Sequence, residues 1–231
     1  MVKNRLKIIE FDKNKNSSAI KMFFNREIVI SKALEAANKI VKDIKINGDN
    51  ALLQAISKYD NVNVNLKKIK VSDQEIQSAI SSVDKSFVKA VNYAKKNIVK
   101  FSKASLKKNW REKTKNGGYV GELFIPIKRV GCYIPGGAAP LVSTSLMTVI
   151  LAKIAGVEEI VACSPPSADG SLNPNIIYAL HNSGATEIYK MGGAHAIASM
   201  AYGTKTIKKV NKIVGPGGPY VTAAKKIVYG D

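Results

Sequence analysis

The chain has 231 residues, of which 45% are hydrophobic and 23% are charged. This composition is typical of a folded globular protein, and it excludes a disordered tail, a fibrous repeat and a small disulfide-stapled domain. The length suffices for one large domain or two small ones. Lys and Arg number 36 against 17 Asp and Glu, which gives a formal net charge of +19.

Such an excess of positive charge is a feature of nucleic-acid-binding proteins, but here it is spread over residues 1–130 and is almost entirely Lys. Surfaces that bind nucleic acid combine arginine with interleaved aromatic side chains, and neither accompanies these lysines. We therefore interpret the charge as a solvated Lys-rich surface and do not expect a nucleic acid partner. Binding of a polyanion is the alternative.

Cysteine usage favours a reducing, cytoplasmic location. The sequence contains Cys132 and Cys163 without a Cys-x-x-Cys spacing, and no short basic-then-apolar signal segment opens it. The longest uncharged run, residues 130–152, is interrupted by glycine, proline and hydroxyl side chains that would leave polar groups unpaired in lipid. That run predicts a strand, a glycine turn and a buried helix, so we expect no membrane-spanning segment.

The apolar pattern divides the chain into three parts. Residues 1–24 are polar and predict an N-terminal extension, residues 25–128 are mainly helical in pattern, and residues 129–231 alternate apolar strands with helices. Such alternation is typical of βαβ units and a parallel sheet. We predict an α/β fold with a parallel Rossmann-like sheet domain at 129–231, preceded by a mainly helical, incomplete first domain whose missing strands come from elsewhere.

In the first half, apolar side chains at helical spacing predict a helix from Ile28 to Ile46 and a second helical segment over 51–59. The segment Ser72-Asp73-Gln74-Glu75 has the form of a capping box, which predicts a short helix with Ser72 as its N-cap. A long helix is predicted over 83–106. Its buried stripe is expected to comprise Phe87, Val91, Tyr93, Ala94, Ile98 and Phe101.

The second half predicts four strands at 129–134, 158–163, 186–190 and 211–214. The helices between and after them are predicted at about 141–155, 174–183, 194–203 and 219–229. Three glycine-rich loops join a strand to the next helix: "YIPGGAAP" from Tyr133, "MGGAHAIA" from Met191 and "VGPGGPYVT" from Val214.

The position of these loops favours ligand binding. In open parallel sheets ligands bind at the carboxyl ends of the strands, where glycine lets a phosphate approach backbone N–H groups at a helix N-terminus. The loops at Tyr133 and Val214 match neither a G-x-G-x-x-G nor a Walker sequence, so tight turns that need positive φ are the alternative. His195, early in a helix, is either a ligand contact or a structural residue, and His181 is assigned no role.

Residues for the chemistry itself are not evident. A metal site needs three or four converging His, Cys, Asp or Glu side chains, and the sequence offers none at suitable spacing. Neither a nucleophile elbow nor a Cys–His pair is indicated. The residues therefore indicate nucleotide binding, and they do not indicate which side chains would catalyse a reaction.

Three segments carry a resemblance to a known family. "RVGCYIPGGAAPLVSTSLMTVILAKIAGVEEIVACSPP", "GATEIYKMGGAHAIASMAYGT" and "VNKIVGPGGPYVTAAKK" resemble histidinol dehydrogenase in order and spacing, and residues 26–60 resemble its helical N-terminal region more loosely. The resemblance implies NAD-dependent oxidation of the small molecule histidinol to histidine, the last steps of histidine biosynthesis. It also implies a zinc ion, a Glu–His catalytic pair and a homodimer. The family's Ala-Gly-Pro-Ser-Glu signature, zinc ligands and catalytic pair lie beyond the position of Asp231, so we expect no catalytic residue and no metal ligand here.

The resemblance implies three cofactor-binding positions. Tyr133 matches the family's cofactor-contacting tyrosine, His195 stands where the family usually has Gln, and Gly218 stands where it usually has Asn. A hydrogen bond lost at such a position costs about 0.5 to 1.5 kcal/mol of affinity. We expect a shortened histidinol dehydrogenase that is inactive alone. The alternatives are a related NAD-dependent dehydrogenase of another small alcohol and a non-catalytic nucleotide- or polyanion-binding module.

Overall fold

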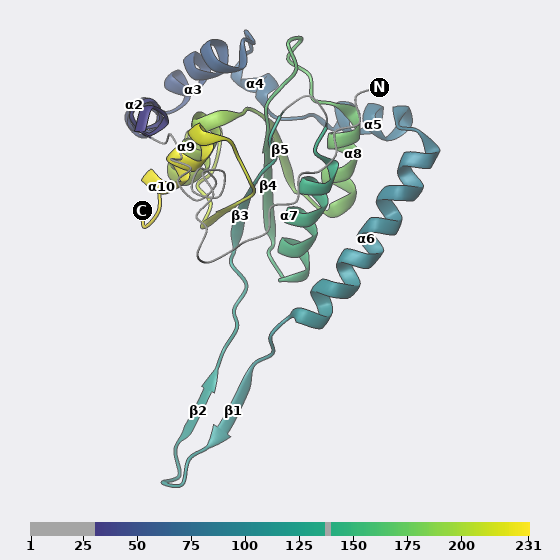
Figure 1. Ribbon diagram of the computed structural model, residues 1–231, viewed down its shortest axis with the longest axis vertical. Helices are drawn as coiled ribbons and strands as arrows, with labels where there is room; N and C mark the ends of the chain where they lie inside the picture. Colours follow the sequence, from purple (N-terminus) through teal and green to yellow (C-terminus); the bar gives the residue numbers. More distant parts are fainter. Residues whose placement is uncertain (1–30, 137–139) are drawn as a thin grey trace, which may run out of the picture.

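The computed structural model describes residues 31–136 and 140–231, so the predicted extension at 1–24 lies outside the described residues. Its centre is a four-stranded parallel sheet in the order β5-β4-β3-β6, shown in Figure 1. The strands are β3 (Arg129–Tyr133), β4 (Glu159–Ser164), β5 (Glu187–Lys190) and β6 (Lys212–Val214). The predicted α/β fold with a parallel sheet is confirmed.

Helices cover both faces of the sheet. They are α7 (Val142–Ile154), α8 (Pro174–Ser183), α9 (Gly193–Tyr202) and α10 (Pro219–Ile227). Alternate residues of β4 explain the two layers, because side chains along a strand point to opposite faces. Ile160 and Ala162 pack in one core with α7 and α8, whereas Val161 and Cys163 pack in a second core with α9 and α10.

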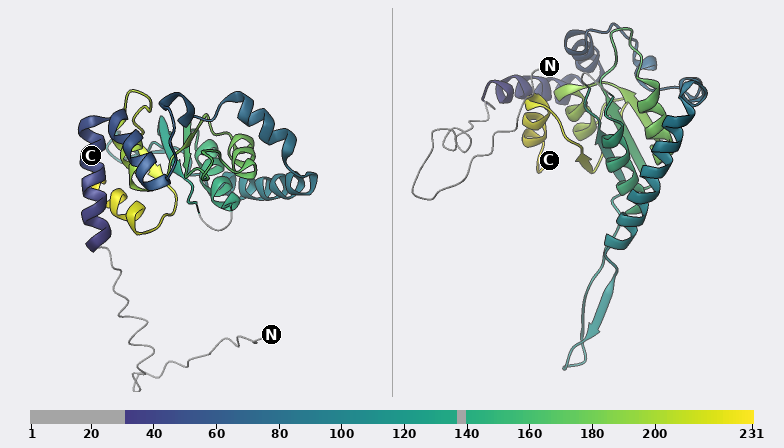
Figure 2. Two further views of the ribbon diagram at one scale, coloured as in Figure 1. Left: turned by 90° about the horizontal axis from the view of Figure 1, so that it is seen from above. Right: turned by 45° about the vertical axis from the view of Figure 1, so that its right-hand side comes forward.

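The first half supplies further helices and a two-stranded arm. They are α2 (Ser31–Asn47), α3 (Asp49–Ala55), a π-helical turn η1 (Ile56–Asp60), α4 (Leu66–Ile69), α5 (Asp73–Ser82), α6 (Lys85–Ser105), β1 (Trp110–Lys113) and β2 (Tyr119–Glu122). These residues add only one antiparallel bridge, Lys70 to Tyr189, to the central sheet. Instead, α2 packs on α9 and α10, α5 on α8, and α6 on α7 (Figure 2). The division into two domains near residue 129 stays a prediction.

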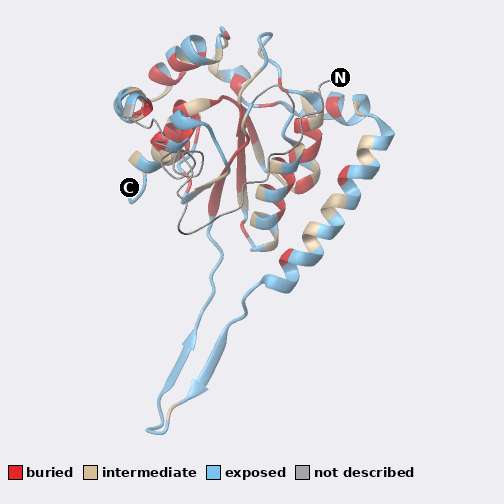
Figure 3. Cartoon of the chain, in the orientation of Figure 1, coloured by how far each residue is buried: buried red, intermediate tan, exposed pale blue. Residues whose placement is uncertain are grey.

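The short helix α5 begins as its sequence predicts. The Ser72 hydroxyl accepts a hydrogen bond from the Glu75 amide, and the Glu75 carboxylate accepts one from the Ser72 amide. The predicted buried stripe of α6 is wrong at two positions, because Tyr93 and Phe101 are 72% and 75% exposed. This long helix lies against α7 along one narrow face, so the outer edges of its stripe remain uncovered (Figure 3).

The hairpin of β1 and β2 extends away from the body of the molecule (Figure 1). All its strand residues are exposed, and they include Trp110, Tyr119 and Val120. No helix in the described part of the chain is long and apolar enough to cross a bilayer.

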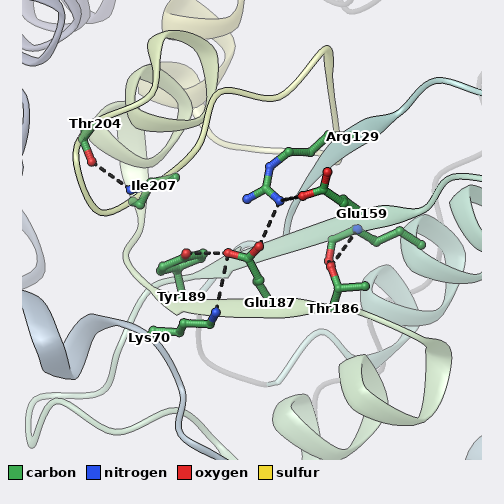
Figure 4. A network of polar contacts seen from close by, with 9 residues as sticks. Lys70, Arg129, Glu159, Thr186, Glu187, Tyr189, Thr204 and Ile207 are labelled. Carbon is green, nitrogen blue, oxygen red and sulfur yellow. Dashed lines mark hydrogen bonds and ion pairs between the residues drawn. The ribbon is translucent and has the colours of Figure 1, made fainter.

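A charged network ties together the amino ends of three strands (Figure 4). The guanidinium of Arg129, at the start of β3, donates to Glu159 of β4 and, at 2.9 Å, to Glu187 of β5. Tyr189 donates to Glu187, and Lys70 lies 3.7 Å from the same carboxylate. Since β3 runs from this network to Tyr133, the network fixes the strand whose far end carries the first glycine loop.

Candidate functional site

A pocket of about 820 Å³ opens at the carboxyl ends of the strands, a volume within the usual range for small-molecule and cofactor sites. It lies between the loops after β3 and β4, the first turns of α9 and α10, and the η1 turn. Tyr133, His195 and Gly218, the three predicted cofactor contacts, all line it. The structure therefore brings the three residues together, and their role toward a cofactor stays a prediction.

The charge of the pocket differs from that of the chain. Among the described residues that line it, Asp60 is the one charged side chain, and neither Lys nor Arg is present. The +19 excess is thus not concentrated at this pocket. An anion bound there would be held by backbone N–H groups and helix N-termini rather than by lysine.

Three helices begin at this edge of the sheet without a side-chain cap. The N-cap residues of α7, α9 and α10 are Leu141, Gly192 and Gly218, and none forms a capping hydrogen bond. By contrast, Asn173 caps α8 through its side chain. The first N–H groups of a helix have no partner within it and carry partial positive charge. The Gly193 amide at the start of α9 donates to Tyr133 and the first residue of α10 is Pro219, so a negatively charged ligand would be held by the remaining N–H groups of the first turns.

Tyr133 links two of the glycine loops. Its hydroxyl accepts a hydrogen bond of 3.0 Å from the Gly193 amide at the start of α9. Burial raises the pKa of Tyr133 to about 12, despite the opposing hydrogen bond from Gly193. The phenol therefore keeps its proton at neutral pH, and that proton is available to a ligand acceptor.

His195 is buried, with 1% of its side chain exposed. Its Nε2 lies 2.9 Å from Oδ2 of Asp60, and the same carboxylate oxygen accepts a hydrogen bond of 3.1 Å from the Gly192 amide. The ring of Tyr59 stacks on the imidazole with centroids 6.2 Å apart. Asp60 thus fixes both the imidazole and the glycine loop after β5.

Glycine is required at one position in the third loop and not at another. Gly215 has a φ of 118°, and a Cβ there would lie 2.1 Å from the carbonyl oxygen of Tyr133. Only glycine permits this approach between the ends of β3 and β6. Gly218 has a φ of −70°, and a Cβ there would meet no atom within 4 Å. The side chain missing at residue 218 therefore leaves open space at the pocket.

Asp60 and Tyr59 are absent from the sequence-based prediction of the site. The helical pattern there indicated a helix ending near Tyr59, whereas the structure has a π-helical turn that ends at Asn61 in the left-handed conformation. Such turns often occur at functional sites. Periodicity does not reveal them, although an acidic residue beside Asn at the end of an apolar helix is a weak signal of a cap.

The described residues do not fit a metal ion. Across 31–136 and 140–231, no group of three or more His, Cys, Asp or Glu side chains is placed to hold one. The two cysteines are buried, and burial raises the pKa of Cys132 to about 12, so it has little tendency to form a thiolate.

Comparison with known proteins agrees with the fold. The family model described as histidinol dehydrogenase matches residues 25–231. The chain belongs to the histidinol dehydrogenase family. The histidinol dehydrogenase of Methanothermobacter thermautotrophicus is 42% identical over 226 residues, which are 98% of this chain and 52% of that protein. That of Methanocaldococcus jannaschii is 46% identical over 199 residues, covering 86% and 46% of the two chains.

A solved structure leads to the same family. The crystal structure of histidinol dehydrogenase from Elizabethkingia anophelis matches with a TM-score of 0.80 and 40% sequence identity. The match covers 84% of this chain and 44% of the other. This chain therefore spans about half the length of the histidinol dehydrogenases that it resembles, and the described half contains the pocket but no metal-binding group.

Proposed function

We propose that this chain is the nucleotide-binding part of a histidinol dehydrogenase and binds NAD in the pocket at the strand ends. The observation that carries the proposal is the convergence of Tyr133, His195 and Gly218 beside the uncapped N-termini of α9 and α10. When bound, NAD supplies the hydride acceptor for oxidation of an alcohol. Backbone N–H groups in the first turns of α9 and α10 would hold its phosphates, and the phenol of Tyr133 would orient it.

Oxidation of histidinol is part of this proposal only for a protein that also contains the second half of the family. The described residues do not fit zinc, so we derive no step through that metal. The homodimer and the cytoplasmic location implied by the family remain predictions. The same lack of a metal-binding group among the described residues favours a second candidate, a nucleotide-binding module without catalysis of its own.

We expect purified chain, supplied with NAD, zinc and histidinol, to produce no NADH above a no-enzyme control. Oxidation of an alcohol by hydride transfer also needs a base or metal at the hydroxyl group, which the family resemblance gives as a zinc ion and a Glu–His pair, and the described residues that line the pocket include no Glu and no metal-binding group. Absorbance of NADH measures the rate. Turnover that disappears in a Tyr133→Phe variant would contradict this expectation, because it would locate a working active site in this chain.

We also expect substitutions at the predicted contacts to change NAD affinity in opposite directions. Tyr133→Phe removes the acceptor for Gly193 and the donor for the ligand, so binding should weaken about three- to tenfold. Gly218→Asn adds an amide in open space and should tighten binding several-fold. Calorimetric titration at fixed salt measures both, with Tyr93→Phe on exposed α6 as a matched control. Equal affinity in all four proteins would show that the pocket is not the NAD site.

A further inference from the structure

The two ring nitrogens of His195 have different surroundings. Nε2 faces the Asp60 carboxylate at 2.9 Å, whereas Nδ1 is buried and has no hydrogen-bond partner in the described part of the chain. A carboxylate only accepts hydrogen bonds, so Nε2 carries the proton. In the neutral ring Nδ1 is then a buried lone pair without a donor.

Nδ1 lies on the side of the ring that faces Gly193. A Cβ at Gly193 would lie 3.5 Å from this nitrogen and would meet only the imidazole within 4 Å outside its own helix backbone and chain neighbours, so the space that a side chain would occupy next to Nδ1 is left open by Gly193. Gly193 and His195 both line the pocket. A ligand atom beside Gly193 is therefore the natural partner for Nδ1.

Asp60 is the one acidic side chain of the described residues in direct contact with the His195 imidazole. The titratable side chains placed around it by the described elements are Asp60, Tyr59 and Lys58 from η1, Tyr133 from β3 and Tyr220 from α10. Helix α2 contributes only Ala36 and Ile40 to the pocket lining. The Asp60–His195 pair therefore has a net charge of −1 when the imidazole is neutral and zero when it is protonated.

We propose that Asp60 is a positioning residue that holds His195 with Nδ1 toward the pocket, so that an anionic ligand is bound together with one proton taken from solvent onto Nδ1. Without ligand, a protonated Nδ1 would be a buried donor with no acceptor, which is costly. A phosphate oxygen beside Gly193 supplies both the acceptor and the negative charge. This inference rests on the proposed function, since it assumes that the ligand is the pyrophosphate of a dinucleotide.

Proton uptake makes the affinity depend on pH. Binding linked to one proton tightens as pH falls, by at most about tenfold per pH unit. An uptake close to one proton near neutral pH corresponds to NAD binding roughly ten- to fiftyfold more tightly at about pH 6 than at about pH 8. A His195→Gln variant has no group that takes up the proton, so its affinity should not change over this range.

Calorimetric titration with NAD, in two buffers of different ionisation enthalpy, counts the protons taken up. The parent should take up close to one proton near neutral pH, His195→Gln none, and Asp60→Asn fewer than the parent, because the imidazolium then lacks its carboxylate. The chain has two histidines, and the other, His181, is exposed on α8. His181→Gln is therefore the matched control and should behave as the parent.

Imidazole NMR gives a second readout that does not depend on affinity. With two histidines, His181→Gln assigns both signals, and His195 should be the Nε2–H tautomer without NAD and doubly protonated with it. Should His195→Gln fail to fold, Asp60→Asn and this spectrum decide. NAD binding with no proton uptake and no pH dependence would overturn the inference and leave the proposed function standing. No NAD binding by the parent at any pH would overturn both.

Discussion

Gly215→Ala is expected to lower the free energy of unfolding by roughly 2 to 5 kcal/mol, a large share of the stability of a domain. The new Cβ would lie 2.1 Å from the carbonyl oxygen of Tyr133, and a φ of 118° is unfavourable for any residue with a side chain. The clash is with backbone, so relief requires β3 or β6 to move. Denaturant unfolding followed by circular dichroism measures the change.

The variant Gly48→Ala is a control that separates the strain of a positive φ from the steric clash expected in Gly215→Ala. Gly48 also has a positive φ, of 54°, but a Cβ there would meet no atom within 4 Å. Gly48→Ala should therefore cost only the strain of the backbone conformation, about 1 to 3 kcal/mol. Equal losses in the two variants would show that the ends of β3 and β6 do not approach each other as described.

Arg129→Met is expected to lower the free energy of unfolding by about 3 kcal/mol. The guanidinium is 5% exposed and pairs with Glu159 and Glu187, so its removal takes the ion-pair partner from Glu159 and leaves the partly buried Glu187 with Tyr189 and the more distant Lys70. Nε and Nη2 of Arg129 are buried and have no hydrogen-bond partner among the described residues. Burying these two donors reduces the net stabilisation that the ion pairs of Arg129 provide. Methionine keeps most of the volume, so the loss reports on charge rather than on packing.

The loss of stability in Arg129→Met should depend on pH. Burial by itself raises the pKa of Glu187, but hydrogen bonds from Arg129 and Tyr189 and the charges of Arg129 and Lys70 outweigh it, so the pKa stays below its ordinary value of 4.5. A lowered folded-state pKa stabilises the fold above that ordinary value, and the contribution is lost as pH falls through the folded-state value. The difference between parent and Arg129→Met should therefore be full at neutral pH and shrink in acid.

Adding the substitution Glu187→Gln tests whether Glu187 is the carboxylate that Arg129 stabilises. Adding Glu187→Gln to Arg129→Met removes one of the stranded charges and should recover part of the lost stability. If the single and double variants are equally unstable at neutral pH, the network in Figure 4 does not carry the stabilisation assigned to it.

Much of the fold could be predicted from the sequence, because the second half of the chain repeats one local pattern. Apolar strands alternate with helices, and in a parallel sheet all loops that follow strands lie at one edge. The positions of Tyr133 and Gly218 at one pocket are a consequence of that topology. The capping box at Ser72 is equally local, since its residues lie three apart.

Other features depend on packing between distant segments. Periodicity places Tyr93 and Phe101 on the apolar side of α6, but the width of the face that α7 covers is set by tertiary contacts. Asp60 reaches His195 across 135 positions of sequence, from a π-helical turn that no periodic pattern signals. The polar partner of the imidazole was therefore not predictable from the sequence.

The pocket as the NAD site is tested most directly by backbone amide NMR of the ¹⁵N-labelled chain, titrated with NAD at fixed salt. The amides of the non-proline residues in 133–136, 192–195 and 215–218 should shift together with a single affinity, because these loops surround the pocket. Amides along α6, which is rich in exposed lysine, should not shift. Shifts confined to α6 and other lysine-rich segments, with the three loops unchanged, would contradict a nucleotide site at the strand ends.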